Sequence, residues 1–556
     1  MGILNYWCQS WRLGTCTLLL LCLLLGAEAG SLTLTSHGQP AASIVIAQTP
    51  TRAAAFAAYE LQALLQQLTG ATLPIVADTP PPNGTVILVG ESTLTQALGL
   101  SGNNFTSGQY LIRLANAQTL VLMGCDKRDT TAVNYANADT FPPYFDDQAT
   151  CYAVYDFLES YGGMRFYWPT ATCLDYTPTP SLTVIITSDT KRAPGFSTRW
   201  PAALYFPKDL AAASTTPPAS LANAELLEKR ETSLYWHRLR MGGQQFTPNH
   251  SFGLWNQYYS THPTWYGVGY PAGTYAQPCM SNAEVKQHLI EAAIAYFDHG
   301  VVPADGVAFG NYFVIVPNDN GNWCKCPACQ RRLHADTTGG HFSNNSASEL
   351  LWPFINEVAA AVCATRPGKY IATLAYADYA YPPTNLPLHP QVAVMMCLHV
   401  RNWWSPKMAQ NDKKILSLWA TGQPQRPLYA WVYDNFPQEM AIGGNWYCFP
   451  AFQAHTFAQQ IALFRQAGVR GVFMNGFGWG LYQGSYRYAV RQNNAVGLAE
   501  QADHYVFLKL LDNPNLNVDT LLREFFTRYY GQAGSTMQAL YNALETTYTT
   551  SANYPA

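Results

Sequence analysis

The stretch ELLWPFINEVAAAVC (Glu349–Cys363), with YIATLAY (Tyr370–Tyr376) and VAVMMCL (Val392–Leu398) after it, decides the fold. The first segment has apolar residues at helical spacing, and the other two are short apolar runs typical of strands buried on both faces. Helices that alternate with such strands predict parallel pairing within one sheet. The alternation extends from residue 195 to residue 495, roughly the 300 residues that a (β/α)8 barrel occupies.

Other segments of this region fit the same pattern. Four more apolar runs are predicted strands: Phe196–Trp200, Val307–Val316, Leu428–Tyr433 and Gly471–Asn475. Two amphipathic segments are predicted helices: Glu284–Phe297 and Phe457–Gln466. We therefore predict an α/β protein with a (β/α)8, TIM-type barrel over residues 195–495. A doubly wound open sheet fits the pattern almost as well.

Residues 30–194 carry an α/β pattern of their own and are predicted to form a sandwich-like domain in front of the barrel. Strands are expected at Ser43–Ala47 and Thr85–Gly90. Between them, leucines at 61, 64, 65 and 68 repeat at helical spacing, and Tyr152–Tyr161 is a second amphipathic helix. Residues 496–556 are predicted to be C-terminal helices.

The composition is that of a chain that folds throughout its length. Hydrophobic residues make up 48% and charged residues 12%, and a net charge of -3 without a Lys/Arg cluster argues against nucleic acid as a partner. Residues 1–29 are predicted to be a signal peptide, with Arg12 before the apolar run Leu18–Leu25 and a cleavage site at Ala27-Glu28-Ala29. We expect a secreted or periplasmic protein with no membrane span in the mature chain. No pattern indicates an oligomeric state.

Three cysteines are closely spaced in the motif Cys324-x-Cys326-x-x-Cys329. With a fourth ligand from Cys279 or His334, they could hold a structural zinc ion in a tetrahedron. In an exported protein the alternative is disulfide bonding, with Cys279 as one partner. Because a closed thiolate site leaves no open coordination position, we expect no cofactor for catalysis.

Several motifs resemble known families. YELQALLQQLTGATLPI (Tyr59–Ile75) and YAVYDFLESYGGMRFYWPT (Tyr152–Thr170) are similar to the N-terminal domain of glycoside hydrolase family 67 alpha-glucuronidases and of related hexosaminidases. CMSNAEV (Cys279–Val285), PNDNGNWCKCPACQ (Pro317–Gln330) and REFFTRYYGQA (Arg523–Ala533) resemble the domain of unknown function family 4838. The resemblance implies a glycosidase-like barrel with a carbohydrate substrate.

Acidic residues at strand ends are the catalytic candidates. Glycoside hydrolysis needs two carboxyl groups, one to protonate the leaving oxygen and one to act as nucleophile or base. In a barrel, catalytic groups lie at the C-terminal ends of the strands. Four acids follow predicted strands: Asp319, Asp378, Asp434 and Glu439. The alternative is loop capping, for example an Asx-turn at Asp319.

Substrate-binding candidates lie near the same strand ends. Arg199 ends the first barrel strand, where a planar guanidinium suits sugar hydroxyls or a carboxylate, with an internal ion pair as the alternative. Arg240 is a candidate because RLRMGG (Arg238–Gly243) matches the family's pattern. The remaining candidates follow strands or fill loops, with packing as the alternative for each: His250, Tyr376, His399, Arg401, Trp403, Tyr433, Asn475 and Trp479.

Three functions are compatible with these residues. The first is an exported, alpha-glucuronidase-like glycoside hydrolase that uses paired carboxylates at the barrel mouth on poly- or oligosaccharides. The absence of any Asp-Glu dipeptide disfavours the substrate-assisted mechanism of hexosaminidases. The second is a non-catalytic carbohydrate-binding protein. The third is a polysaccharide lyase that relies on His250, His399, Tyr433 and arginines.

Overall fold

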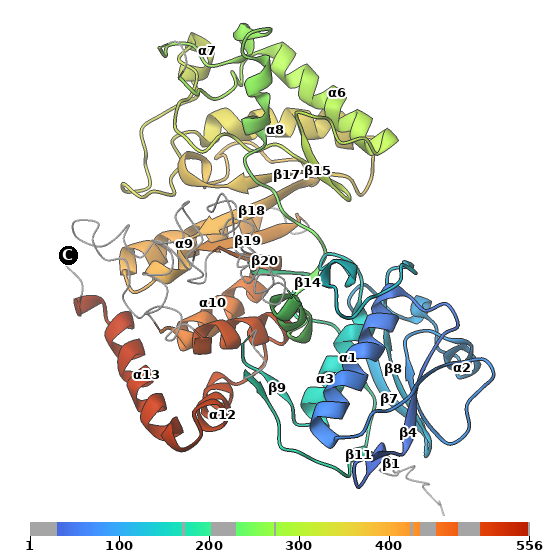
Figure 1. Cartoon of the computed structure of the whole chain (residues 1–556). Helices are drawn as coiled ribbons and strands as arrows, with labels where there is room; N and C mark the ends of the chain where they lie inside the picture. Colours follow the sequence, from blue (N-terminus) through green and yellow to red (C-terminus); the bar gives the residue numbers. More distant parts are fainter. Residues whose placement is uncertain are drawn as a thin grey trace, which may run out of the picture.

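The computed structural model describes residues 30–168, 173–201, 230–271, 274–422, 426–433, 452–475 and 501–553. These residues form an N-terminal α/β domain, a curled sheet surrounded by helices, and C-terminal helices (Figure 1). The predicted α/β class and the order of these three parts are confirmed. The predicted signal peptide, residues 1–29, lies outside the described residues. Among the described helices, none combines the length and apolar composition of a membrane span.

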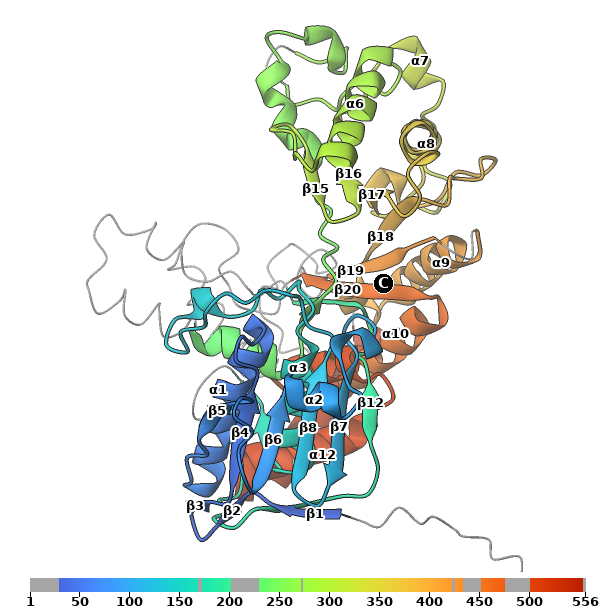
Figure 2. The ribbon, with the colours of Figure 1, turned by 90° about the vertical axis from the view of Figure 1, so that its right-hand side faces the viewer.

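The N-terminal domain is built on a six-stranded mixed sheet of order β12-β7-β8-β6-β4-β5 (Figure 2). Its strands are β4 (Ala42–Ile46), β5 (Ile75–Ala77), β6 (Thr85–Val89), β7 (Tyr110–Asn116), β8 (Thr119–Gly124) and β12 (Thr190–Arg192). Shorter strands pair two by two: β1 (Gly30–Thr33) with β11 (Thr183–Ile186), β2 (Thr35–Ser36) with β3 (Gln39–Pro40), and β9 (Arg165–Phe166) with β10 (Leu174–Asp175). The adjacent strands β5, β4, β6 and β8 are parallel to one another, and β7 is antiparallel to both of its neighbours, β8 and β12.

Helices α1 (Arg52–Thr69) and α3 (Ala149–Ser160) pack against one another and against this sheet (Figure 1). Helix α1 begins after Thr51, whose hydroxyl accepts a hydrogen bond from the N–H of Ala54 (3.1 Å). It ends at Gly70, which takes the left-handed conformation (φ 78) that glycine adopts at low cost. The four leucines of the predicted helix are buried: Leu61, Leu64, Leu65 and Leu68. A short helix, α2 (Thr93–Ala97), follows β6.

The second part is an eight-stranded sheet of order β14-β13-β20-β19-β18-β17-β16-β15, curled into a half-barrel (Figure 1). Its six central strands are parallel: β13 (Thr198–Pro201), β20 (Val469–Asn475), β19 (Leu428–Tyr433), β18 (Val392–Leu398), β17 (Tyr370–Ala375) and β16 (Tyr312–Val314). The edge strands β14 (Gly242–Gly243) and β15 (Val307–Phe309) are antiparallel to their neighbours. The longer helices that the described residues of this part contain are α6 (Ala283–His299), α8 (Ser348–Cys363), α9 (Pro406–Gly422) and α10 (Ala454–Gln466).

The central strands β17 to β20 and β13 of the half-barrel follow the apolar runs of the sequence, whereas the edge strand β14 is a glycine pair that no apolar run predicted. All seven residues of β18 are buried, as an unbroken apolar run predicts. The prediction of a single strand over Val307–Val316 was wrong, because the chain reverses there and forms the hairpin of β15 and β16. The turn lies at Gly310, whose positive φ of 52 suits a residue without a Cβ.

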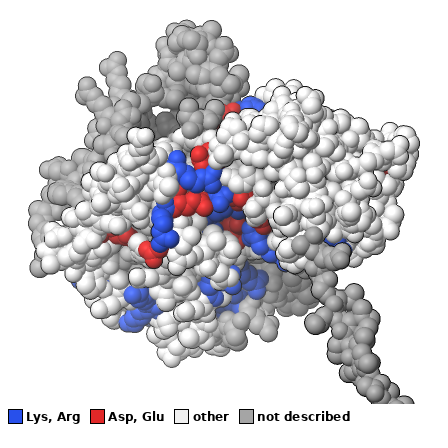
Figure 3. Space-filling view, turned by 90° about the horizontal axis from the view of Figure 1, so that it is seen from below, with Lys and Arg blue, Asp and Glu red and all other residues white. Residues whose placement is uncertain are grey.

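The C-terminal helices are residues 501–512, α12 (Val518–Tyr530) and α13 (Gly534–Thr549). Their buried residues include three neighbours on α12: Leu522, Phe525 and Phe526. Ion pairs Arg165–Glu524 and Arg528–Asp175 join α12 to the N-terminal domain. On the face seen from below, charged side chains of both signs gather in a hollow (Figure 3).

A buried ion cluster lies where the three parts of the molecule meet. Arg240 contacts Glu159 (2.7 Å) and Asp512 (2.9 Å). Arg192 also contacts Asp512 (3.0 Å), and Lys509 contacts Glu159 (2.7 Å). Burial alone would raise the pKa of Asp512, but Arg240 and Arg192 outweigh it and hold that pKa well below its ordinary value. These contacts fix α3 and β12 to the chain before β14 and to the 501–512 helix.

Candidate functional site

The carboxyl ends of the parallel strands bring several predicted residues together. Tyr376 follows β17, His399 follows β18, and Tyr433 ends β19. The rings of His399 and Tyr433 stack at 5.2 Å. Asn475 ends β20 and is the register partner of Tyr433. Neighbouring parallel strands end at one edge of a sheet, so side chains distant in sequence meet there.

Phe342 joins these side chains into a continuous aromatic row, which we define as Tyr376, Phe342, His399 and Tyr433. Its ring lies 5.5 Å from that of Tyr376 and 5.4 Å from that of His399. Phe342 is 50% exposed, so about half of this apolar side chain is accessible to a ligand. Phe342 is not among the residues that the sequence predicts for the site. It comes from the loop before α8 and follows no strand, so the strand-end rule misses it.

Asp319 lies at one end of the aromatic row, in the loop after β16. The Tyr376 hydroxyl donates a hydrogen bond to its Oδ1 (3.1 Å), and Nε2 of His250 lies 3.8 Å from the same oxygen. Nδ1 of His250 is 2.5 Å from the carbonyl oxygen of Pro317, so Nδ1 carries a hydrogen and donates to that carbonyl. The Asp319 side chain is 66% exposed and open to a ligand. The structure thus brings three of the predicted residues together.

Asp378 lies in the turn that follows β17, η6 (Ala377–Tyr379). Its Oδ2 accepts a hydrogen bond from the indole N–H of Trp323 (2.9 Å), a residue of the loop that carries Asp319. Burial raises the pKa of Tyr379 well above its ordinary value, and the negative charges of Asp319 and Asp378 contribute to the rise. The other two predicted acids, Asp434 and Glu439, and the predicted Trp479 lie outside the described residues.

Asp412 of α9 holds the turn after β18. Its Oδ2 accepts from the backbone N–H of His399 (2.8 Å) and from the indole N–H of Trp403 (2.8 Å). The carboxyl is buried, and burial raises the pKa of Asp412 to about 7. Burial also lowers the pKa of His399 to about 4, so this ring is neutral at pH 7. The carbonyl of Arg401 accepts a hydrogen bond from Tyr548 (2.5 Å), which ties α13 to the same turn.

Arg199 and Arg240 lie at the boundary with the N-terminal domain. Arg199 is buried and donates to the carbonyls of Arg240 (2.7 Å) and Phe196 (2.6 Å) and to the hydroxyl of Tyr152 (3.0 Å). Arg240 belongs to the buried ion cluster. The described contacts of both guanidiniums are with protein groups that join the domains, and their substrate-binding roles stay predictions.

The four predicted cysteines form a compact cluster. The sulfur atoms of Cys279, Cys324, Cys326 and Cys329 all lie within 4.8 Å of one another. Cys279 is 3.9 Å from Cys326 and 3.8 Å from Cys329, and all four are free thiols. Hydrogen bonds from Cys279 and Cys329 hold the pKa of Cys324 well below its ordinary value. The cluster could hold a metal ion, with Cys279 as the fourth ligand.

The family model for the domain of unknown function DUF4838 matches residues 168–542, well over half of the chain. The chain belongs to the DUF4838 family. The predicted membership of family 4838 is therefore confirmed. The likeness of the front segment to family 67 glucuronidases and hexosaminidases stays a prediction. No curated protein matches this DUF4838 protein.

Solved structures provide one further comparison. The DUF4838 protein is similar, at 12% identity and a TM-score of 0.48, to BtGH115A, a family GH115 4-O-methyl-alpha-glucuronidase with specificity for decorated arabinogalactans. The match covers 92% of the DUF4838 chain and 62% of the other chain, so this protein spans less than two thirds of the glucuronidase's length.

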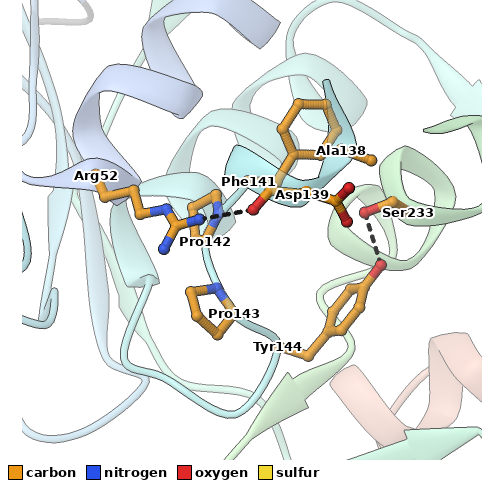
Figure 4. Close-up of a pocket in the computed structure, with 8 residues that line it drawn as sticks. All are labelled: Arg52, Ala138, Asp139, Phe141, Pro142, Pro143, Tyr144 and Ser233. Atoms are coloured by element: carbon orange, nitrogen blue, oxygen red, sulfur yellow. Dashed lines mark hydrogen bonds between the residues drawn. The ribbon is translucent and has the colours of Figure 1, made fainter. Parts of the chain in front are cut away.

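The DUF4838 protein also has a pocket of about 360 Å³ beside the N-terminal domain (Figure 4). The Tyr144 hydroxyl donates to Ser233 (2.8 Å) at one side, and Arg52 donates to the carbonyl of Asp139 (3.2 Å) at the other. The remaining lining residues are Ala138, Phe141, Pro142 and Pro143. None of these lining residues belongs to the predicted site, which lies at the strand ends of the half-barrel.

Proposed function

We propose that this protein is a glycoside hydrolase that cleaves O-glycosidic bonds of poly- or oligosaccharides at the carboxyl ends of its parallel strands. The observation that carries the proposal is Asp319, an exposed carboxylate that accepts a hydrogen bond from Tyr376 and lies beside His250 at the end of an aromatic row. Aromatic rings offer apolar faces to sugars, and glycosidases act through carboxyl groups beside them. Family membership is compatible with this activity and does not specify it.

Asp319 and Asp378 are the described members of the proposed acid pair. Tyr376 orients one oxygen of Asp319, and Trp323 orients one oxygen of Asp378, so each carboxylate is fixed while its loop stays accessible. Such orientation keeps a catalytic group in the geometry that the reaction needs. The predicted acids Asp434 and Glu439 remain candidates for the same pair. The aromatic row is the proposed wall against which the sugar rings lie.

The test is a screen for hydrolysis of uronic-acid and hexosamine oligosaccharides. Asp319→Asn keeps the shape of the side chain and removes its acid–base function, so kcat is expected to fall roughly 10²–10⁴-fold. Asp189→Asn is the matched control, because Asp189 is 41% exposed and pairs with Arg113 in the N-terminal domain. Hydrolysis that survives Asp319→Asn at an undiminished rate would overturn the assignment. Phe342→Ala should raise KM with little change in kcat.

A polysaccharide lyase is the second candidate, and the contact of His250 and Tyr376 with one carboxylate favours it. A lyase abstracts a proton next to a uronic carboxyl and leaves an unsaturated sugar, which absorbs in the ultraviolet. Product absorbance from a uronic-acid polymer separates the two reactions, because hydrolysis releases reducing ends without it. Saturable binding of an oligosaccharide without turnover would instead indicate a carbohydrate-binding protein.

The cysteine cluster is the proposed site of a structural zinc ion. Four Zn–S bonds of ~2.3 Å form a tetrahedron whose edges are about 3.8 Å, and the sulfur of Cys279 lies 3.9 Å from that of Cys326 and 3.8 Å from that of Cys329. Elemental analysis of the purified protein should give one zinc ion per chain, and Cys326→Ser should remove it. The predicted signal peptide makes export part of the same proposal. N-terminal sequencing of exported protein should begin at Gly30.

A further inference from the structure

The cysteine cluster lies at the end of a two-armed loop structure, which we call the clasp and define as residues 275–279 and 318–324. Gln277 is buried at its centre. Its side-chain N–H groups donate to the carbonyls of Asn318 (2.8 Å) and Asn320 (2.8 Å), and its side-chain oxygen accepts from the N–H of Asn318 (2.9 Å). The Gln277 N–H donates to the carbonyl of Asn322 (3.0 Å). One side chain thus holds the backbone on both sides of Asp319.

Tyr275 reinforces the same contact between the arms. Its carbonyl accepts from the side-chain amides of Asn320 (3.2 Å) and Asn322 (3.0 Å), and its hydroxyl donates to Asn318 (2.8 Å). Asp319 itself makes none of these contacts, and its side chain projects outward. The NDNGN sequence therefore supplies polar side chains that fix the loop and leave its single acid available.

The four thiols lie where the two arms of the clasp meet, and all four are free. Cys279 ends the first arm, Cys324 ends the second, and Cys326 and Cys329 follow within one turn. Outside the bridge between Tyr266 and Pro278, the arms have irregular backbone rather than strands of the main sheet. Trp323 and Cys324 pack on the hydrophobic core, while the irregular backbone around Asp319 depends on the contacts between the two arms.

We propose that a zinc ion bound by Cys279, Cys324, Cys326 and Cys329 closes the clasp and thereby positions both candidate carboxylates of the carbohydrate site. Asp319 is positioned directly, because it lies between two residues bound by Gln277. Asp378 is positioned through Trp323, which directly precedes Cys324 and donates to its carboxylate. The metal then acts at a distance as a positioning element, and the four thiolates leave no coordination position for substrate. The carbohydrate role rests on the function proposed above.

The test measures the loop itself and needs no substrate. Amide hydrogen exchange is followed by mass spectrometry in the full-length protein, first zinc-loaded, then stripped with a chelator, then reloaded with Zn²⁺. Exchange in residues 275–279, 318–324 and 377–379 should accelerate at least tenfold on stripping and recover on reloading. Exchange in β4, β6 and β8 should not change. Failure to bind zinc, zinc loss without faster exchange at 318–324, or acceleration throughout the chain would each overturn the inference.

Variants separate the metal from the loop. Cys326→Ser should lose zinc and show the exchange pattern of the stripped protein. Cys125→Ser, at a half-buried thiol of the N-terminal domain, should keep zinc and the exchange pattern of the zinc-loaded protein. Gln277→Ala should retain zinc yet accelerate exchange at 318–322. If hydrolysis is found, Gln277→Ala should lower kcat with KM changed less than twofold. If no glycan is turned over, the proposed function fails while the exchange results still decide whether zinc positions the loop.

Discussion

Removing the positive charge of Arg240 tests how the domains are joined. Arg192 also contacts Asp156 (3.0 Å). The buried ion cluster thus contains three cations and three carboxylates: Arg192, Arg240 and Lys509 with Asp156, Glu159 and Asp512. Arg240→Met keeps an unbranched side chain and the Cβ at a left-handed backbone (φ 60), so the backbone strain at this position is unchanged. Breaking a buried ion pair costs about 3–5 kcal/mol. Because Glu159 keeps Lys509 and Asp512 keeps Arg192, we expect the lower end, about 3 kcal/mol.

The assay is urea unfolding at pH 7, followed by tryptophan fluorescence and circular dichroism. Arg113→Met is the matched control, because the pair of Arg113 with Asp189 is over one third exposed on both sides and should contribute only about 0–1 kcal/mol. Arg240→Met should therefore lower the free energy of unfolding far more than the control does. Equal effects of the two variants would refute the reasoning and would mean that solvent already screens the buried cluster.

Three other predictions concern pH and packing. The hydrogen bonds to Glu545 (2.7 Å) and Asp519 (3.1 Å) raise the pKa of His455 to about 9. The stabilisation from these contacts is complete below about pH 6.5 and is lost as pH rises through 9. His455→Gln should therefore lower the free energy of unfolding by about 1 kcal/mol at pH 6 and leave it unchanged at pH 10, measured by urea unfolding. Burial raises the pKa of Asp412 from 3.8 to about 7, which disfavours the folded state as pH rises through that range. Asp412→Asn should therefore gain stability over the wild type between about pH 4 and 7, by up to about 4 kcal/mol in unfolding titrations, and an unchanged difference would contradict this prediction. A Cβ at Gly471 would lie 2.3 Å from the Cβ of Thr198, so Gly471→Ala should separate β20 from β13 and cost about 1–3 kcal/mol, and an unchanged thermal midpoint would exclude that clash.

The sequence predicted those elements whose signal is local. Helix α1 has its cap, its leucine stripe and its terminal glycine within twenty residues, and β18 is a run of seven apolar residues. The hairpin at Gly310 was missed because its turn lies inside an apolar run, where a glycine resembles one more strand residue. The curl of the half-barrel and its antiparallel edges depend on pairing between distant segments, which periodicity does not report.

For the site, the strand-end rule found the residues that strands position and missed those that other elements bring in. His250, Asp319 and Tyr376 were predicted separately and lie together. Asp412 was missed because it lies in a helix, although it interrupts an apolar stripe of α9 between Met408 and Ile415, both buried. An acid within such a stripe is a usable signal of a buried polar contact. Gln277 offers no comparable signal, since its partners are about forty residues away in the sequence.

The two sides of the candidate site are held by different physical means, and this makes them separable. On one side, the turn after β18 depends on a buried carboxyl, Asp412, whose pKa of about 7 makes its charge sensitive to pH near neutrality. On the other side, the loop with Asp319 depends on amide hydrogen bonds and on four thiols, which a chelator addresses. Asp412→Asn should therefore alter the environment of His399 without changing zinc content. Removal of zinc should loosen Asp319 and leave the hydrogen bond between Tyr548 and Arg401 intact, which hydrogen exchange in α13 would reveal.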